Sequence, residues 1–96
     1  MVIRNVVHRG LRRFIQRGDS SGLPPSAVEK VRNILTFLQG MEDVQELRDI
    51  PFWRAHQLSG GRKGTWSLTV THNWRITFRI NRIEGEILAL DFEDYH

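Results

Sequence analysis

The spacing of apolar residues divides the chain into an N-terminal part with helical periodicity and a C-terminal part with strand periodicity. Residues 2–7 are short and rich in β-branched side chains, which predicts a strand. Residues 9–17 carry apolar residues at helical spacing and are followed by Gly18, which predicts a helix closed by a glycine. We expect His8, at the junction between these two elements, to act as a local cap.

The clearest helix is predicted over residues 26–40. One stripe of this helix is apolar and is formed by Ala27, Val31, Ile34, Leu35 and Leu38. Ser26 is followed three residues later by Glu29, the spacing of a capping box, in which two free backbone amides are bonded reciprocally. Gly40 is expected to close the helix, and residues 42–49 to add one or two further turns.

The second half alternates with a period of two. Strands are predicted over residues 52–58, 65–71, 74–80 and 86–92, with a loop at 59–64 that holds three glycines and two cations. Within these strands the apolar positions share one face, and the other face carries Thr, Ser and Arg. We expect that polar face to stay open to solvent or to a ligand.

These elements predict an α+β fold, a small antiparallel sheet of four to five strands with two N-terminal helices packed on one face. Residues 1–96 are expected to form a single domain, because one core suffices for a chain of this length. The sequence has no cysteine, which excludes disulfides, thiolate zinc sites and a cysteine nucleophile. No apolar run approaches the roughly 18 residues that cross a bilayer, and no signal peptide is evident. We therefore expect a cytoplasmic protein with no membrane partner.

Charge is grouped along the chain. The net charge is +3, and 12 of the 14 basic residues are arginines, which bind phosphate oxygens in pairs. Residues 1–18 and 51–82 contain no acid, whereas acids outnumber bases in residues 19–50 and 83–96. Two acid-free basic segments predict a positive face, if the fold brings them together. The alternative is that each basic segment pairs with the acidic segment beside it.

Histidine is the main candidate for proton transfer. The four histidines lack the spacing of a metal site, so we expect neither a metal nor a cofactor. His72 is interpreted as a solvated turn residue. His56 precedes the basic loop, and His96 follows Asp94, a carboxylate that favours a charged imidazole. Taken from the residues alone, the simpler interpretation is favoured for both: His56 as an ordinary strand residue and His96 as a terminal residue.

Two arginines are expected to project from the polar face of the sheet. Arg75 and Arg79 alternate with apolar residues, so they point away from the core and can clamp a phosphodiester near the 59–64 loop. That loop lacks the spacing of a P-loop. The alternative is cross-strand pairing with carboxylates, which fits Arg79 better than Arg75; the acids concerned are Glu84, Glu86 and Asp91.

Two segments make the sequence similar to a known family. The stretch W-S-L-T-V-T-H-N-W-R-I-T-F at residues 66–78 and the ending E-D-Y-H at residues 93–96 resemble the HigB toxins of the RelE/ParE superfamily. The segments R-G-L-R-R-F-I-Q-R-G and S-G-L-P fit as well. The resemblance implies a RelE-like fold and the toxin of a type II toxin–antitoxin system. It further implies a ribosome-dependent endoribonuclease that cuts mRNA in the A site. A helix-turn-helix antitoxin (HigA-like) would neutralise it, and the pair would bind operator DNA.

The resemblance also transfers site residues. The family motif L-H-P-L-K-G appears as A-H-Q-L-S-G, so His56 matches and Ser59 replaces the family lysine. The remaining matches are Arg62 in the following D-R-x-G motif, Arg75 in N-W-R-I, and Asp94, Tyr95 and His96 in D-Y-H. Further contacts to RNA phosphates are expected from the basic residues Lys63, Arg79, Arg12 and Arg13.

The implied reaction is metal-free attack of a ribose 2′-hydroxyl on its own phosphate. In this hypothesis His56 and His96 share the proton transfers, while Arg62 and Arg75 stabilise the developing charge. Tyr95 would stack on a base or orient the 2′-hydroxyl, and Asp94 would hold His96.

Two alternatives remain open from the sequence. One is a ParE-like DNA gyrase inhibitor, against which the D-Y-H ending speaks, and the other is a catalytically inactive RNA- or antitoxin-binding module. Ser59 keeps the second alternative open, because serine supplies no cation.

Overall fold

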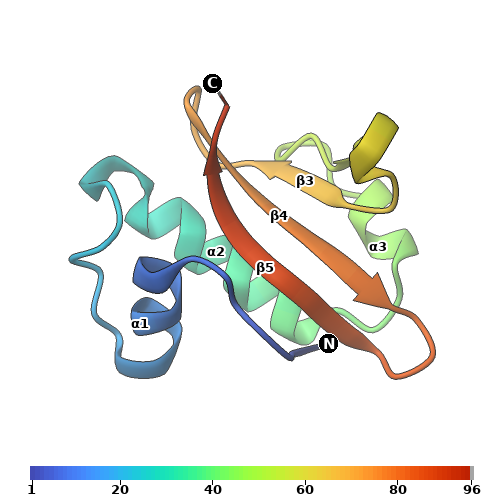
Figure 1. Ribbon diagram of the computed structural model, residues 1–96, viewed down its shortest axis with the longest axis horizontal. Coiled ribbons are helices and arrows are strands. Elements are labelled where there is room, and N and C mark those ends of the chain that lie inside the picture. Colours follow the sequence, from blue (N-terminus) through green and yellow to red (C-terminus); the bar gives the residue numbers. More distant parts are fainter. Residues whose placement is uncertain (96) are drawn as a thin grey trace.

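A five-stranded sheet forms the centre of the computed structural model, which describes residues 1–95 (Figure 1). The spatial order is β1-β5-β4-β3-β2. The strands are β1 (Val2–Ile3), β2 (His56–Gln57), β3 (Trp66–Thr69), β4 (Trp74–Asn81) and β5 (Glu86–Asp94). All neighbours are antiparallel except β1, which runs parallel to β5. The α+β fold is thus confirmed, with a parallel strand at one edge because the chain crosses the sheet through its helices between β1 and β2.

The first helix matches its prediction. Helix α1 spans Arg9–Arg17, and Gly18 ends it in the left-handed conformation at φ 70°. His8 caps the other end, where its Nδ1 accepts the backbone N–H of Leu11 at 3.0 Å. Local hydrogen-bonding chemistry therefore determines both ends of this helix.

Helix α2 spans Val28–Gly40, and its predicted capping box is wrong. The residue before the helix is Ala27, which makes no side-chain cap, and Ser26 lies in a 3₁₀ turn over Pro25–Ala27. Pro24 and Pro25 favour this turn, because proline fixes φ at a value suited to a first helical position. Ala27 N–H donates to the Pro24 carbonyl at 2.9 Å, and this backbone bond takes the place of the expected side-chain cap.

The strand predicted over residues 52–58 is mostly wrong. A one-turn helix, α3 (Gln45–Arg48), is followed by a turn over residues 51–54, and only His56–Gln57 pair in the sheet. Arg54 has a left-handed backbone at φ 49°, which β-strand geometry does not allow. This turn places Arg54 two residues before His56.

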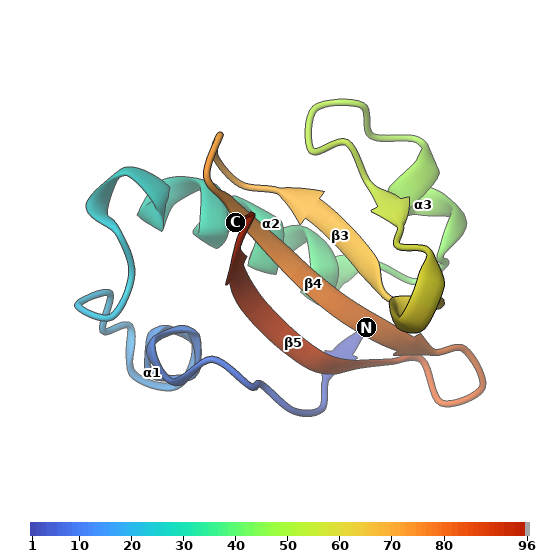
Figure 2. The same ribbon diagram turned by 45° about the horizontal axis from the view of Figure 1, so that its top comes forward.

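One apolar core lies between the helices and the sheet. The stripe predicted on α2 is buried, as are Trp66 and Leu68 of β3 and Val70 directly after it. Leu11 and Phe14 of α1 join the same core. Figure 2 shows α2 crossing behind β3 and β4, with α1 beside β5. No helix within residues 1–95 has the length and apolarity needed to cross a membrane.

A bulge in β5 sets which side chains face this core. The register with β4 shifts between Thr77 and Arg79, and Ala89 at the bulge has φ 51°. Asn5 holds the bulge, because its side-chain oxygen accepts the N–H of Ala89. The extra residue lets both Ile87 and Phe92 point into the core, and the next residue, Glu93, points to the opposite face.

Candidate active site

The site residues lie in two adjacent rows across the polar face of the sheet. One row joins His56, Ser67, Thr77 and Asp91 through successive strand pairs, and the next joins Thr69, Arg75 and Glu93. Register partners in antiparallel strands point to the same side. Residues that are distant in sequence are therefore neighbours on one surface.

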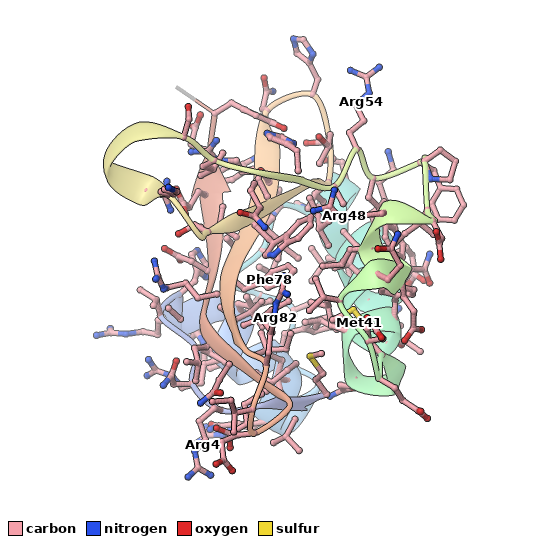
Figure 3. All side chains as sticks on the ribbon, turned by 90° about the vertical axis from the view of Figure 1, so that its right-hand side faces the viewer. Arg4, Met41, Arg48, Arg54, Phe78 and Arg82 are labelled. Carbon is pink, nitrogen blue, oxygen red and sulfur yellow. The ribbon has the colours of Figure 1, made fainter. Side chains whose placement is uncertain are left out.

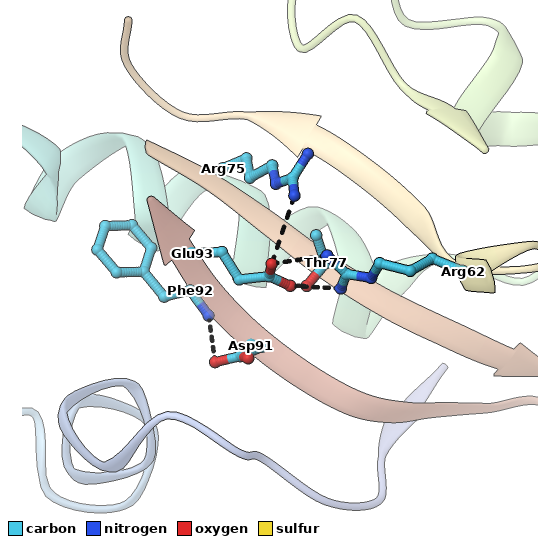
Figure 4. Close-up of polar contacts among 6 residues, drawn as sticks. All are labelled: Arg62, Arg75, Thr77, Asp91, Phe92 and Glu93. Carbon is cyan, nitrogen blue, oxygen red and sulfur yellow. Dashed lines mark hydrogen bonds and ion pairs between the residues drawn. The ribbon is translucent and has the colours of Figure 1, made fainter. Parts of the chain in front are cut away.

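Glu93 is the centre of the polar contacts on this face (Figure 4). Its two carboxylate oxygens accept hydrogen bonds from both terminal nitrogens of Arg62, at 2.8 and 2.6 Å. Arg75 Nη2 lies 3.4 Å from the same carboxylate, and the hydroxyl of Thr77 donates to it as well. Two guanidinium groups from a loop and a strand thus converge on one anion.

These contacts keep Glu93 ionised. The hydrogen bonds from Arg62 lower the pKa of Glu93 to about 2, against the opposing effect of partial burial, and Thr77 and Arg75 contribute further. The same pairing raises the pKa of Arg62 above its ordinary value. A carboxylate with so low a pKa is a poor proton acceptor near neutral pH, so Glu93 is suited to orienting the arginines and not to general base catalysis.

Tyr95 lies against the second row of this face. Its hydroxyl is 2.8 Å from Thr69 Oγ1, and its backbone N–H donates to the Asn73 carbonyl at 3.0 Å. The guanidinium of Arg75 lies over the ring, 5.3 Å from its centroid, in a cation–π contact. The ring is 39% exposed, so one side of it is accessible to a ligand.

His56 is exposed, and its ring is held by the backbone. Nδ1 lies 2.8 Å from the carbonyl oxygen of Arg54. A carbonyl oxygen only accepts hydrogen bonds, so Nδ1 carries the proton and Nε2 is left for another partner. The left-handed turn at Arg54 is what directs this carbonyl toward the ring.

The polar face is less open than the sequence predicts. Ser67 and Thr77 are buried, because Glu93 and its partner Arg62 lie over the centre of the face. The interpretation that carboxylate pairing fits Arg79 better than Arg75 is wrong, since Arg75 makes the ion pair with Glu93. Pairing between a basic and an acidic segment, the alternative to a free positive face, therefore holds for Arg62 and Arg75.

The other predicted basic contacts fall into two groups. Lys63 and Arg79 are exposed, and the Arg79 guanidinium lies beside Gly64, so both are close to the loop that carries Arg62. Arg12 donates to the Val6 carbonyl at 2.8 Å, and Arg13 packs against Gly22. The structure thus brings the first pair near Arg62 and Arg75, the arginine cluster on Glu93, and gives the second pair local contacts around α1.

The terminal motif is described only as far as Tyr95. Asp94 is exposed and in register with Trp74, so it alternates with Glu93 and starts toward the other face of the sheet. His96 lies outside the described residues, and its partnership with Asp94 and His56 stays a prediction.

Glu93 is a site residue that is not among those predicted from the sequence. Glu93 lies two residues from Asp91 on the polar face and directly opposite Arg75. That register depends on the bulge at Ala89, which the alternation of residues 86–92 does not reveal.

The sequence matches a known family and a known protein over nearly its whole length. The family of RelE-like toxins of the type II toxin–antitoxin system HigB matches residues 4–96. Endoribonuclease HigB of Proteus vulgaris is 36% identical over 95 residues, which cover 99% of this chain and 100% of that protein.

Solved structures share the fold at low sequence identity. The toxin–antitoxin complex RelBE2 from Mycobacterium tuberculosis matches with a TM-score of 0.53 and 19% identity, over 97% of this chain and 95% of the other. The YoeB dimer from Staphylococcus aureus matches with a TM-score of 0.54 and 13% identity, over 99% and 93% of the two chains. Because the family match extends over nearly the whole sequence, this chain belongs to the HigB-like family of RelE-like toxins of type II toxin–antitoxin systems.

Proposed function

We propose that this toxin is an endoribonuclease that cleaves mRNA in the ribosomal A site and so inhibits translation. The observation that carries the proposal is the convergence of Arg62 and Arg75 on the carboxylate of Glu93. A phosphodiester presents two oxygens in much the same geometry as a carboxylate, and guanidinium groups bind both. The name of the relative from Proteus vulgaris, an endoribonuclease, supports the same activity.

The arginines would stabilise charge at the scissile phosphate. Arg62 is on a loop, between Gly61 and Lys63, and its side chain is 45% exposed, so an entering phosphate would reach it and take the place of Glu93. Arg75 is fixed more firmly, on β4 with its side chain 19% exposed. Removal of one such donor typically lowers the rate about 10²–10³-fold.

His56 would transfer a proton through Nε2. The 2′-oxygen loses its proton to a base and bonds to phosphorus, while the bond from phosphorus to the 5′-oxygen breaks and that oxygen takes a proton from an acid. The products are a 2′,3′-cyclic phosphate and a 5′-hydroxyl. His56 and His96 are proposed to supply the base and the acid, which typically contribute about 10²–10⁴-fold each.

Tyr95 and Asp94 have supporting roles in this proposal. The accessible side of the Tyr95 ring would stack on a base or orient the 2′-hydroxyl, while Arg75 and Thr69 hold the ring in place. Asp94 would orient His96. Lys63 and Arg79 flank the loop of Arg62 and would contact neighbouring phosphates, and Arg12 and Arg13 would contact RNA through α1.

The proposal includes three macromolecular partners. Membership of a toxin–antitoxin family makes an antitoxin the partner that restrains this chain. We propose that it is a helix-turn-helix, HigA-like protein, and that the complex binds operator DNA. The ribosome would hold the mRNA in position, so free RNA should be cut poorly.

Mapping mRNA 5′ ends after expression in cells tests the proposal. Wild-type protein should arrest growth and produce new 5′ ends in phase with codons, and His56→Ala and Arg75→Ala should reduce them by about 10²-fold or more. Arg82→Gln, which removes a cation from an exposed turn, is the matched control and should cut normally.

Other outcomes identify the alternatives. Growth arrest with intact mRNA and double-strand DNA breaks would replace the proposal by gyrase inhibition. Absence of arrest from soluble, folded wild-type protein would leave a binding module without activity.

A further inference from the structure

A separate pocket of about 690 Å³ opens at the end of β3, beside the arginine cluster. It lies between the turn over residues 51–54, the hairpin that joins β3 to β4, and Tyr95. Figure 3 shows Arg54 projecting at this end of the molecule, opposite the end that carries Arg4. Small-molecule sites are commonly pockets of roughly 300–1,000 Å³, so this pocket is large enough for a nucleotide.

The lining of the pocket is basic, with aromatic surface. Lys30 from α2 and Arg54 supply two cations, His72 adds an imidazole, and no acidic side chain among residues 1–95 lines the pocket. Its charge therefore complements an anion. None of these three groups takes part in the contacts around Glu93.

The aromatic part of the lining is held in place before any ligand binds. Trp53 packs edge to face on Phe37, with the ring centroids 5.4 Å apart, and on Phe52, at 5.1 Å. Phe52 itself is 69% exposed. An exposed ring supported by a second ring resembles the stacking platforms of single-strand binding proteins.

Tyr95 connects the pocket to the candidate active site. It lines the pocket, and it also contacts Thr69 and Arg75 in the row that contains Glu93. Thr69 lines the pocket as well. Tyr95 therefore belongs both to the pocket and to the group of contacts around Glu93, as two neighbouring nucleotides of one RNA strand would require.

We propose that this pocket is a second nucleotide subsite, which holds the nucleotide next to the cleaved phosphate. Its base would stack on Phe52 and Trp53, and its phosphate would bind Lys30 and Arg54. The inference rests on the proposed endoribonuclease function, and it assigns residues outside the arginine and histidine set to substrate binding.

Binding of a 2′-deoxy trinucleotide tests the subsite without any cleavage, because the attacking hydroxyl is missing. The readout is the NMR shift of the Trp53 indole N–H and of the backbone amides of residues 69–71, in wild type and in two variants. Phe52→Ala should weaken binding about tenfold, because stacking on an aromatic ring contributes about that much per base. The ring is exposed, so the variant should still fold. Lys30→Gln should weaken binding and lower its dependence on salt. Arg82→Gln is the control of equal charge and should bind like wild type.

Several results would overturn the subsite. One is that the trinucleotide shifts the NMR signals of Arg75 and Tyr95 but not the indole signal of Trp53. Another is inorganic phosphate giving the same shifts as the trinucleotide, with Phe52→Ala unaffected, which would mean an anion site without base recognition. Displacement of the trinucleotide by a glutamate-rich peptide of higher affinity would assign the pocket to a protein partner. Binding that follows the prediction in a protein that leaves mRNA intact in cells would support the subsite and reject the proposed cleavage.

Discussion

Arg54 shows how one backbone conformation can orient a candidate catalytic side chain. Its φ of 49° is left-handed, which typically costs a residue other than glycine about 1–2 kcal/mol. That conformation points its carbonyl oxygen at Nδ1 of His56, 2.8 Å away. Residues with such strain often lie at functional sites, where the surrounding structure maintains them.

The first prediction concerns the tautomer of His56. In Arg54→Gly the left-handed turn is retained, so neutral His56 should keep its proton on Nδ1, as in wild type. In Arg54→Val the β-branched side chain disfavours this turn, and the proton should move to Nε2 with up to about a 10²-fold loss of cleavage. Nitrogen-15 NMR of the imidazole distinguishes the two forms. An unchanged tautomer in Arg54→Val would show that the carbonyl does not control the ring.

The second prediction concerns the contribution of Glu93 to the stability of the fold. Its pKa is lowered to about 2 from an ordinary 4.5, so it stabilises the fold fully above about pH 5 and loses that contribution as the pH falls toward 2. Glu93→Gln should lower the free energy of unfolding at pH 7 by about 2 kcal/mol, a value reduced for the solvent exposure of Arg62. It should also flatten the decline of stability between about pH 5 and pH 2.

Chemical denaturation at several pH values measures both effects. Glu84→Gln, which removes a carboxylate from an exposed turn, is the control. A Glu93→Gln variant whose stability declines with acid as steeply as that of wild type would contradict the role assigned to the Arg62 pair.

At the scale of elements, the bulge in β5 makes the site possible. Without the additional residue at Ala89, either Ile87 or Phe92 would point away from the core. Glu93 would then no longer lie opposite Arg75. Ala89 adopts a strained, left-handed backbone at this position, with a φ of 51°.

The bulge leads to the third prediction. Ala89→Gly should leave the free energy of unfolding unchanged or raise it slightly, because glycine adopts this backbone without strain. Ala89→Val should lower it by about 2 kcal/mol, since a β-branched residue is poorly tolerated at positive φ. Thermal unfolding of the two variants is the measurement, and equal stability of Ala89→Val and wild type would show that β5 does not require the left-handed residue.

The same elements show where sequence patterns succeed. The ends of α1 follow from local chemistry at His8 and Gly18, and both were predictable. The start of α2 was not, because a spacing that fits a capping box was outweighed by the two prolines before it. The turn over residues 51–54 was not predicted, because no sequence pattern indicates that an arginine adopts a left-handed φ.

At the scale of the whole molecule, the alternating faces of β3 and β4 predict the sheet and its core, and the family resemblance identifies Arg62 and Arg75. The convergence of these arginines on Glu93 could not be predicted, since it depends on a long-range register and on a loop that folds over the sheet. The grouped charges have a structural counterpart here: part of the basic segment 51–82 is neutralised by ion pairs with the acidic segment 83–96.

The proposed chemistry is tested most directly by cleavage of a defined mRNA on purified ribosomes, in the presence of a chelator of free transition metals. The mRNA carries either ribose or 2′-deoxyribose at the nucleotide before the cut. We predict a 2′,3′-cyclic phosphate and a 5′-hydroxyl from the ribose mRNA, no cut in the deoxy mRNA, and little cutting of either without ribosomes. Cleavage of the deoxy mRNA at the same position and rate would contradict attack by the 2′-hydroxyl, and with it the roles proposed for His56, Arg62 and Arg75.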